Sequence, residues 1–501
     1  MKIIKHIFFS LCAFMASSAY GACTGSSPTW TASNDQASVA SCVSSASDGD
    51  TINISSGTTT WTTHVTITKA LSIIGAGKTS TVIGGNSAVF LINTSSPKNV
   101  RISAIGFTGN GGSLSGSLEN QKINIRGTID TVRLDNLKFT DIGDHGVYVG
   151  LWDLITQQPR ILIDHIDYSC NTASQGGAFC RFAKFECHNN TWTQSDRAGS
   201  DWFIFIEDST FTWTGSADTN AGVTDTEHGC RMVVRYNTIA GGGVQVHDTG
   251  STEAARGQRY TEIYNNTFTC SITNCSNIPA IGLRGGGYLV YNNSIASGFW
   301  VPAYVQVYRA TVGPGYLGSC GATAIKGCNA SPTYSYYHCS TSPFQGCGYS
   351  GGPQSCNSGG TCVLTATSSA SCAANEYIAD LDRVNGGSDT SGYPCRDQTG
   401  WGQEYSNGTR QWPSPVEWWG NTQGGSALNL SSAYNETTWQ YNRDGCNSAV
   451  TTTTAPDGRT TYSVPACGAR AAWKYTPYFY PHPFQSGFKS RPSAPTGVTG
   501  N

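Results

Sequence analysis

A recurring pattern of apolar and polar positions dominates this chain. A few alternating apolar residues lead to a small polar residue, usually Asn or Asp, and a large apolar residue follows three positions later. The pattern occupies residues 132–139, 161–168, 185–192, 204–211, 261–268 and 288–295, and its closing apolar residues fall at 139, 168, 192, 211, 239, 268 and 295. These residues are 19 to 29 positions apart, which is typical of one rung of a solenoid. Stacked rungs would share an apolar interior while Asn side chains form a ladder between them.

A second set of short apolar strands lies between these segments, at residues 146–150, 177–181, 243–248 and 280–284. Each rung is therefore expected to carry at least two strands. Two-residue hairpin turns are mostly missing between adjacent runs, which favours parallel coils over antiparallel hairpins.

The first part of the chain predicts a cap for the open end of the solenoid. Residues 35–43 have apolar positions at helical spacing, and 48–57 read as a turn and a short strand. Together with 71–77 and 81–83, this opening resembles the start of right-handed parallel β-helix proteins of the pectin-lyase-like (pectate lyase) superfamily. The resemblance covers roughly residues 30 to 300 and implies an all-β, right-handed parallel β-helix.

The chain divides into five predicted segments. The order of basic, apolar and small residues at the start indicates a cleaved secretory signal. The predicted segments are a signal peptide at 1–21, the β-helix at 22–300, a Cys-rich insertion at 301–375, an aromatic-rich region packing on the β-helix at 376–484 and a flexible tail at 485–501. Residues 417–422 repeat the strand-plus-Asn pattern, so this late region is expected to add or cap a coil.

Composition narrows the partners and the compartment. The chain has 19 Cys, and removing Cys12 with the signal leaves an even number, which predicts disulfides in an exported protein, extracellular or periplasmic. A lipid anchor on Cys23 is the alternative, although Tyr20 stands where such signals usually have Leu. No apolar stretch is long enough to span a membrane, and we expect a monomer. Charged residues make up 12% of the chain and the net charge is -2, which excludes a nucleic-acid partner.

Titratable residues gather in one part of this charge-poor chain. His247 and Asp248 end one strand of the second set, and Arg284 ends the next, so one coil of offset places them about 5 Å apart along the axis. Further candidates lie in the intervening loop (Glu253, Arg256 and Arg259) and upstream (Asp225 and Glu227).

These residue types suit β-elimination on an acidic polysaccharide. The reaction needs a cation for the uronate carboxylate, a base for the adjacent proton and a donor for the leaving oxygen. The predicted catalytic residues are His247, Arg284, Arg256 and Arg259; Asp248 and Glu253 are predicted to bind substrate, and Asp225, Glu227 and Asp248 to hold calcium. The alternative is that Arg and Asp at turns only pair with one another and cap strands.

The Trp residues of the late region have two interpretations. Trp401 and Trp412 are flanked by small and polar residues, so we predict exposed platforms on which sugar rings stack. Trp418 and Trp419 are predicted to serve the core or cap a coil.

A second resemblance concerns Asp164 and His165, which match the Asp-His pair that follows a strand in pectate lyases. In the repeat register they occupy the ladder position, which favours a structural role. The chain has no Arg-x-Pro-x-x-Arg segment of the kind that carries the pectate-lyase base.

We therefore predict a secreted protein that binds and cleaves an acidic polysaccharide, as a lyase. Two alternatives stay open. An inverting hydrolase would need carboxylates about 6.5 to 9.5 Å apart across one groove. A surface adhesin or structural β-helix would line its exposed face with Thr, Ser and Asn.

Overall fold

The structure is a computed structural model, and it describes most of the chain between residues 23 and 488. The described residues are 23–109, 121–143, 145–150, 158–172, 180–215, 221–247, 257–270, 275, 278–306, 399–404, 411–430, 439 and 441–488, with the backbone of three strands at 336–339, 342–348 and 362–366. The predicted signal peptide lies outside the described residues, as does most of the predicted Cys-rich insertion.

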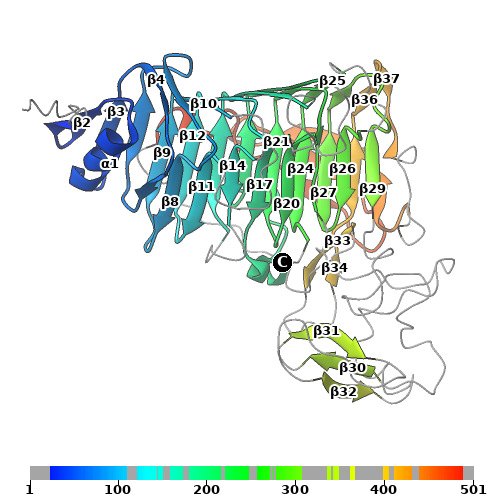
Figure 1. The fold of residues 1–501 in the computed structure, drawn as a ribbon. Coiled ribbons are helices and arrows are strands. Elements are labelled where there is room, and N and C mark those ends of the chain that lie inside the picture. Colours follow the sequence, from blue (N-terminus) through cyan, green and yellow to red (C-terminus); the bar gives the residue numbers. More distant parts are fainter. Residues whose placement is uncertain are drawn as a thin grey trace, which may run out of the picture.

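A right-handed parallel β-helix forms the body of the protein (Figure 1), which confirms the predicted fold class. Each complete coil gives one strand to each of three long sheets, called A, B and C here, and each strand pairs in parallel with its counterpart on the next coil. Right-handed crossover is the normal connection between parallel strands of one sheet. The rungs thus carry three strands, one more than the minimum that the sequence predicts.

The strands of the three sheets, in spatial order within the described residues, are as follows. Sheet A consists of β1 (Thr24–Ser26), β2 (Thr29–Ala32), β3 (Thr51–Ile54), β6 (Ser72–Gly75), β9 (Asn99–Ser103), β12 (Thr131–Asp135), β15 (Arg160–Asp164), β18 (Ile204–Glu207), β21 (Arg231–Arg235), β24 (Tyr260–Tyr264), β27 (Gly287–Tyr291), β35 (Val416–Trp419) and β38 (Gly445–Asn447). Sheet B consists of β4 (Gly57–Thr60), β7 (Thr81–Gly84), β10 (Gly106–Thr108), β13 (Lys138–Thr140), β16 (Asp167–Asn171), β19 (Thr210–Thr214), β22 (Thr238–Ala240), β25 (Thr267–Thr269), β28 (Ser294–Ile295), β36 (Thr422–Gln423) and β37 (Ser426–Ala427). Sheet C consists of β5 (Val65–Ile67), β8 (Phe90–Thr94), β11 (Ile123–Gly127), β14 (Val147–Val149), β17 (Arg181–Glu186), β20 (Gly222–Glu227), β23 (Gly243–Val244), β26 (Ile281–Arg284) and β29 (Ala303–Gln306).

Shorter elements accompany these sheets. Three small antiparallel sheets are formed by β30 (Tyr336–Cys339), β31 (Ser342–Gly348) and β32 (Cys362–Ala366), by β33 (Trp401–Glu404) and β34 (Gln411–Pro413), and by β39 (Thr451–Thr454), β40 (Thr460–Val464) and β41 (Trp473–Tyr475). The described helices are α1 (Gln36–Ser45) and two 3-10 turns, η1 (Asn189–Thr193) and η5 (Pro483–Gln485).

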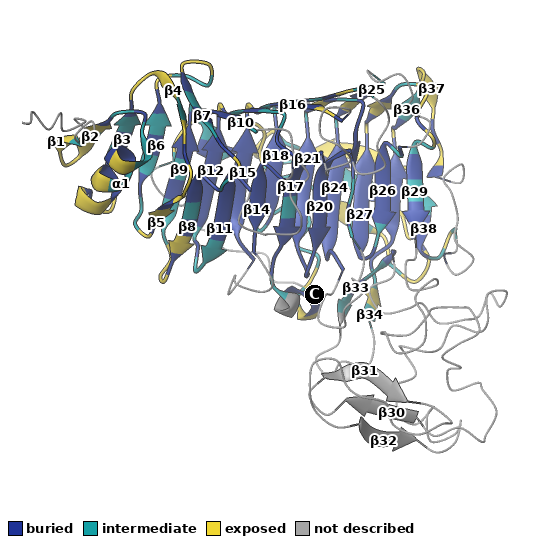
Figure 2. Cartoon of the chain, in the orientation of Figure 1, coloured by how far each residue is buried: buried dark blue, intermediate teal, exposed yellow. Residues whose placement is uncertain are grey.

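Side chains that alternate along each strand fill the interior of the β-helix. In sheet B, Phe107, Phe139, Tyr168 and Phe211 take the same place on four successive coils, and all are buried. Figure 2 shows the central strands of sheets A and C as buried almost throughout. Stacking identical positions removes apolar surface that a lone coil would leave in water.

One predicted rung is wrong. The sequence places Trp192 between Tyr168 and Phe211 in the series of closing residues, but the structure pairs Tyr168 directly with Phe211. Residues 185 and 186 end β17 of sheet C, and Trp192 lies in η1. Residues 185–192 have the same apolar pattern as the other repeats, but their strand, β17, belongs to sheet C, whereas the other repeats run from sheet A into sheet B.

The predicted Asn ladder is present at the turn from sheet A to sheet B. The Asn237 side-chain amide donates to Asn266 Oδ1 at 3.0 Å, Asn266 to Asn293 Oδ1 at 3.0 Å, and Asn293 to Asn421 Oδ1 at 2.9 Å. Asn421 follows β35, so the predicted late coil is confirmed, since β35 pairs in parallel with β27.

Helix α1 lies at the N-terminal end of the β-helix, as predicted (Figure 1). Asp35 caps it, accepting a hydrogen bond from the Ser38 backbone N–H at 2.8 Å, and Val39 and Val43 are buried. A disulfide joins Cys23 to Cys42, so the Cys23 sulfur that a lipid anchor would use is already bonded.

The C-terminal region covers the outer face of sheet A. A second buried apolar cluster forms there, and it contains Phe205, Tyr264, Tyr291 and Trp419 from sheet A together with Tyr475 and Phe484 from the C-terminal region. Trp418 points into the β-helix core instead, so both Trp418 and Trp419 are buried, in accordance with the prediction.

Disulfides confirm a further prediction. Within the described residues they join Cys23 to Cys42, Cys170 to Cys180, Cys187 to Cys230, Cys270 to Cys275 and Cys446 to Cys467. Over the same residues, no helix has the length and apolar character needed to cross a membrane.

Candidate functional site

The outer face of sheet C carries a row of titratable residues along the axis of the β-helix. In β17, Ala183 and Phe185 are buried in the core, so Lys184 and Glu186 between and after them point outward. The same alternation applies on neighbouring strands. We call the resulting set the charged row: Tyr148 on β14, Lys184 and Glu186 on β17, Asp225 and Glu227 on β20, His247 after β23, and Arg284 on β26.

Lys184 joins two carboxylates of the charged row. Its Nζ lies 3.0 Å from Glu186 Oε1 and 2.8 Å from Glu227 Oε1, and 5.9 Å from the centre of the Tyr148 ring. Burial opposes the charge on Lys184, but Glu227, Asp225 and Glu186 outweigh it and raise the pKa of the ammonium. Lys184 is therefore held protonated.

Burial lowers the pKa of Lys184 but raises the pKa of two other members of the charged row, Tyr148 and Glu227. It raises the pKa of the Tyr148 hydroxyl, and the nearby carboxylate of Glu186 raises it further, so Tyr148 keeps its proton. Burial also raises the pKa of Glu227, and the contact with Lys184 only partly offsets this effect.

Asp225 lies between Arg181 and His247. It forms an ion pair with Arg181, and its Oδ1 lies 3.6 Å from His247 Nε2. Burial raises the pKa of Asp225, but the positive charges of Arg181 and Lys184 outweigh burial, and the net result is a lowered pKa. Asp225 is therefore ionised.

His247 and Arg284 lie on adjacent coils, as the sequence predicts. Val244 pairs with Ile281, and the same register places His247 beside Arg284. Burial lowers the pKa of His247 to about 3, and the positive charge of Arg284 adds to this effect against the attraction of Asp225. The imidazole is thus neutral near pH 7, and its contact with Asp225 is not an ion pair.

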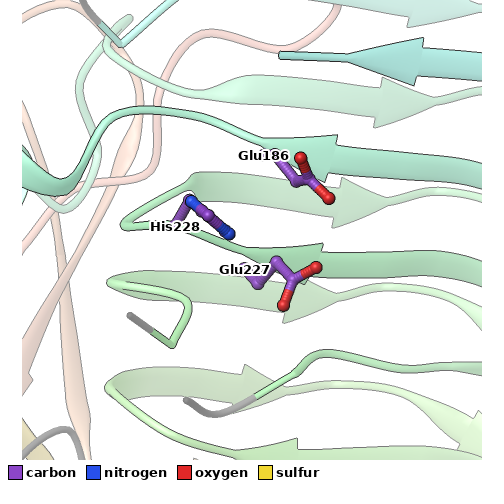
Figure 3. A group of neighbouring side chains, drawn as sticks. All are labelled: Glu186, Glu227 and His228. Carbon is purple, nitrogen blue, oxygen red and sulfur yellow. The ribbon is translucent and has the colours of Figure 1, made fainter. Parts of the chain in front are cut away.

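A potential metal-ligand group overlaps the charged row (Figure 3). Glu186, Glu227 and His228 each offer one ligand atom, and these atoms lie within 4.8 Å of one another. The predicted calcium ligands divide between two environments: Glu227 belongs to this group, while Asp225 is paired with Arg181. Carboxylate oxygens suit calcium, but the Lys184 ammonium already lies against both glutamates.

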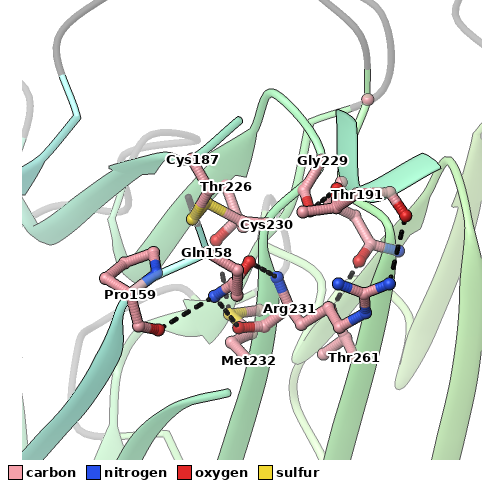
Figure 4. Close-up of a disulfide and its surroundings, with 12 residues drawn as sticks. Gln158, Pro159, Cys187, Thr191, Thr226, Gly229, Cys230, Arg231, Met232 and Thr261 are labelled. Atoms are coloured by element: carbon pink, nitrogen blue, oxygen red, sulfur yellow. Dashed lines mark hydrogen bonds between the residues drawn. A yellow bond between two sulfur atoms is a disulfide. The ribbon is translucent and has the colours of Figure 1, made fainter. Parts of the chain in front are cut away.

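A disulfide fixes the backbone at the end of the charged row (Figure 4). Cys187 directly follows Glu186 and bonds to Cys230, two residues after His228. Between them, Gly229 has a φ of +73° and so little room that an added Cβ would lie 2.2 Å from Thr191 Oγ1. Only glycine fits this turn, which holds the ends of β17 and β20 together.

The structure separates Arg259 from the charged row. Its fully buried guanidinium pairs with Asp196 at 2.7 Å and donates to the Gln194 carbonyl at 2.9 Å. Its partners therefore lie in the loop after η1, not among the carboxylates beside Lys184. Three other predicted site residues, Asp248, Glu253 and Arg256, lie outside the described residues.

The two predicted aromatic platforms differ in their surroundings. Trp412 on β34 is 49% exposed. Trp401 on β33 is partly buried, and its indole N–H donates to Asp444 Oδ1 at 2.9 Å. Neither strand belongs to sheet C.

Asp164 and His165 lie at the end of β15, on the outer face of sheet A. The buried Asp164 carboxylate pairs with Arg133 at 3.0 Å. His165 adopts a left-handed conformation, with a φ of +55°, and its Nδ1 lies 2.8 Å from Asp164 Oδ2. This arrangement agrees with a structural role.

The sequence analysis does not predict every residue of this site. It misses three members of the charged row and one neighbour: Tyr148, Lys184, Glu186 and Arg181. The signal is present in the sequence, because Lys184 and Glu186 are charged residues that alternate with buried Ala183 and Phe185. The repeat pattern groups residues 185–192 with the strands of sheet A, because Trp192 resembles a closing residue. Charged side chains on sheet A would not lie on the same face as His247, so Lys184 and Glu186 are not predicted.

Comparisons with known proteins give a likeness to solved structures. No protein-family model matches the chain, and no curated protein matches it. Among solved structures, the chain is similar to a variant of the PL6 family alginate lyase AlyGC, with a TM-score of 0.28 and 11% sequence identity. The match covers 89% of this chain and 56% of that one, so the chain spans little more than half the length of that structure.

Proposed function

We propose that this protein is a secreted lyase that cleaves an acidic polysaccharide on the outer face of sheet C. The observation that carries the proposal is the charged row itself: a neutral imidazole, an arginine and a protonated lysine lie on neighbouring coils of one face. Strand spacing of about 4.8 Å is close to the length of one sugar residue in an extended chain. A polymer lying along the axis would thus meet these groups in succession.

In the proposed reaction, His247 removes the proton next to the uronate carboxylate. A neutral imidazole can accept this proton, and burial keeps His247 neutral. Arg284, one coil further, neutralises the substrate carboxylate and so stabilises the negative charge that develops when the proton leaves.

Lys184 is the proposed proton donor. As the electron pair of the broken C–H bond forms the new C=C bond, the bond to the leaving oxygen breaks, and that oxygen takes a proton from the ammonium. Lys184 suits this role because Glu186 and Glu227 hold it protonated. Lys184 contacts Glu227 and His247 contacts Asp225, and both carboxylates lie on β20. The proposed donor and the proposed base therefore lie on either side of the same strand.

The spacing of Glu186 and Glu227 does not suit inverting hydrolysis. One oxygen of Glu186 lies within 4.8 Å of one oxygen of Glu227, whereas an inverting pair needs about 6.5 to 9.5 Å to admit water. Lys184 also lies between these two carboxylates.

Calcium stays a prediction at this site. Glu186, Glu227 and His228 are the described side chains that could hold it, and a bound cation would add to the neutralisation of the uronate charge. Activity assays with and without chelator decide whether Lys184 and Arg284 neutralise the uronate charge without a metal ion.

The test is incubation of the purified protein with a panel of polyuronates and neutral polysaccharides. Ultraviolet absorbance reports unsaturated uronates, and a reducing-end assay reports every chain break. We expect new absorbance with a polyuronate. Reducing ends without absorbance would instead identify a hydrolase, and inactivity on all polymers would favour an adhesin. His64→Ala, which changes an exposed histidine just before β5 at the N-terminal end of sheet C, is the matched control for His247→Ala.

A further inference from the structure

Two aromatic side chains extend the outer face of sheet C beyond Arg284. Tyr304 lies on β29, where Ala303 and Val305 on either side are buried in the core, so the Tyr304 ring points outward with the charged row. Trp300 precedes this strand and is 47% exposed, and its ring centre lies 5.0 Å from that of Tyr304 at an interplanar angle of 44°.

The backbone fixes Trp300 in this place. Its N–H donates to the carbonyls of Cys275 and Ile278, at 3.0 and 3.1 Å. Cys275 is joined to Cys270 by a disulfide. Trp300 is thus hydrogen-bonded to a cross-linked residue, and presenting its exposed indole costs little additional ordering of the chain.

The register sets the distance from this aromatic pair to the charged row. Tyr304 pairs with Gly282 on β26, two residues before Arg284. An added Cβ at Gly282 would have no neighbour closer than 3.7 Å, so the absent side chain leaves room between Gln245 and Tyr304. Four strand spacings separate β17 from β29, about 19 Å, which corresponds to a few sugar residues.

We infer that Trp300 and Tyr304 form a subsite that stacks a sugar ring of the polysaccharide, about two strand spacings from His247 along the axis. The inference rests on the proposed function for the identity of the polymer. The apolar face of a pyranose ring packs on an aromatic face, and the polar tips of Trp and Tyr tolerate the polar edge of the sugar. The subsite would bind substrate and set its register without taking part in proton transfer.

The test compares Trp300→Ala and Tyr304→Ala with the unchanged full-length chain. Affinity electrophoresis in gels containing polyuronate measures binding without requiring cleavage. We expect about tenfold weaker binding for Trp300→Ala, and recovery in Trp300→Tyr, which keeps an aromatic face. In cleavage assays, KM should rise with little change in kcat, and only for oligosaccharides long enough to reach both His247 and Trp300.

Phe479→Ala is the matched control, because Phe479 is 40% exposed in the region that covers sheet A. Unaltered binding by both alanine variants, in a chain that binds polyuronate, would overturn the subsite. Aromatic-dependent binding without cleavage by the unchanged chain would keep the subsite and overturn the lyase. A chain that binds no polyuronate would overturn both.

Discussion

Burial and neighbouring charges give individual side chains of the charged row different protonation states. The His247 side chain is 30% exposed, yet burial of its ring beside Arg284 lowers its pKa to about 3. Lys184 stays charged because Glu186 and Glu227 lie against it. A neutral base and a charged proton donor can therefore exist together on one face of the protein near pH 7.

The first prediction concerns His247. If it is the base, His247→Ala should lower kcat by about 10² to 10⁴-fold and leave the fold intact. Because the His247 pKa is about 3, kcat/KM of the unchanged chain should not fall through protonation of this group between about pH 8 and pH 5. Initial rates from ultraviolet absorbance across this range provide the measurement. A loss of activity centred near the ordinary histidine pKa of about 6.5 would contradict a His247 that stays neutral over this range.

The second prediction concerns Lys184. Lys184→Met leaves Glu186 and Glu227 without their cation, and it should cost about 3 kcal/mol of unfolding free energy as well as most of the activity. Denaturant unfolding measures the first effect. Lys78→Met is the control, since Lys78 pairs with Asp167 in a more exposed place, and its loss should cost less than about 1 kcal/mol. Equal costs for the two variants would show that the Lys184 contacts are weak.

Among the secondary-structure elements, one backbone conformation recurs where sheet A turns into sheet B. His165, Tyr236, Asn265 and Asn292 all have φ between +54° and +56°. In the later coils, the next residue is the buried Asn of the ladder, which binds the backbone on its own coil and on the preceding one. The Asn-Asn pairs in the sequence thus have two roles: the first residue turns the chain and the second joins the coils.

The third prediction tests the ladder. Asn266→Leu removes hydrogen bonds to the Val234 and Tyr264 carbonyls and leaves these buried groups without that donor. We expect a loss of about 2 to 4 kcal/mol in unfolding free energy, measured by denaturant titration. The neighbouring Asn265→Gly should cost far less, because glycine readily adopts the positive φ at this position. A similar loss in both variants would mean that the turn, and not the ladder, provides the stability.

Across the molecule as a whole, the C-terminal region turns an outer face of the β-helix into a second core. Arg235 is fully buried there, paired with Glu207 at 2.6 Å, and it donates to the carbonyls of Tyr478 and Phe479. Glu262 on β24 accepts hydrogen bonds from the Tyr475 hydroxyl at 2.5 Å and from the Gly199 N–H at 2.7 Å. Sheet A is therefore covered, while sheet C carries the charged row.

The fourth prediction follows from the burial of Glu262, which raises its pKa from 4.5 to about 7. The folded protein keeps a proton that the unfolded chain releases between these values, so stability should fall as pH rises from about 4.5 to 7 and then level off. The contribution is about 3 kcal/mol. Unfolding at about pH 5 and pH 8 measures it, and Glu262→Gln should reduce the difference. An unchanged pH dependence in this variant would assign it to other groups, such as Glu417, whose pKa burial also raises to about 7.

Local periodicity was enough to predict the repeat, the parallel coils, the capping helix and the Asn ladder, because these depend on residues a regular step apart along the chain. It also placed His247 and Arg284 on adjacent coils, since their separation is one coil. It could not place Lys184 and Glu186 on the same face, because the irregular spacing around Trp192 concealed which sheet β17 joins. The three-dimensional path of the chain was needed for that assignment. The same holds for the burial of Arg259, because burial depends on loops and on a C-terminal region far away in the sequence.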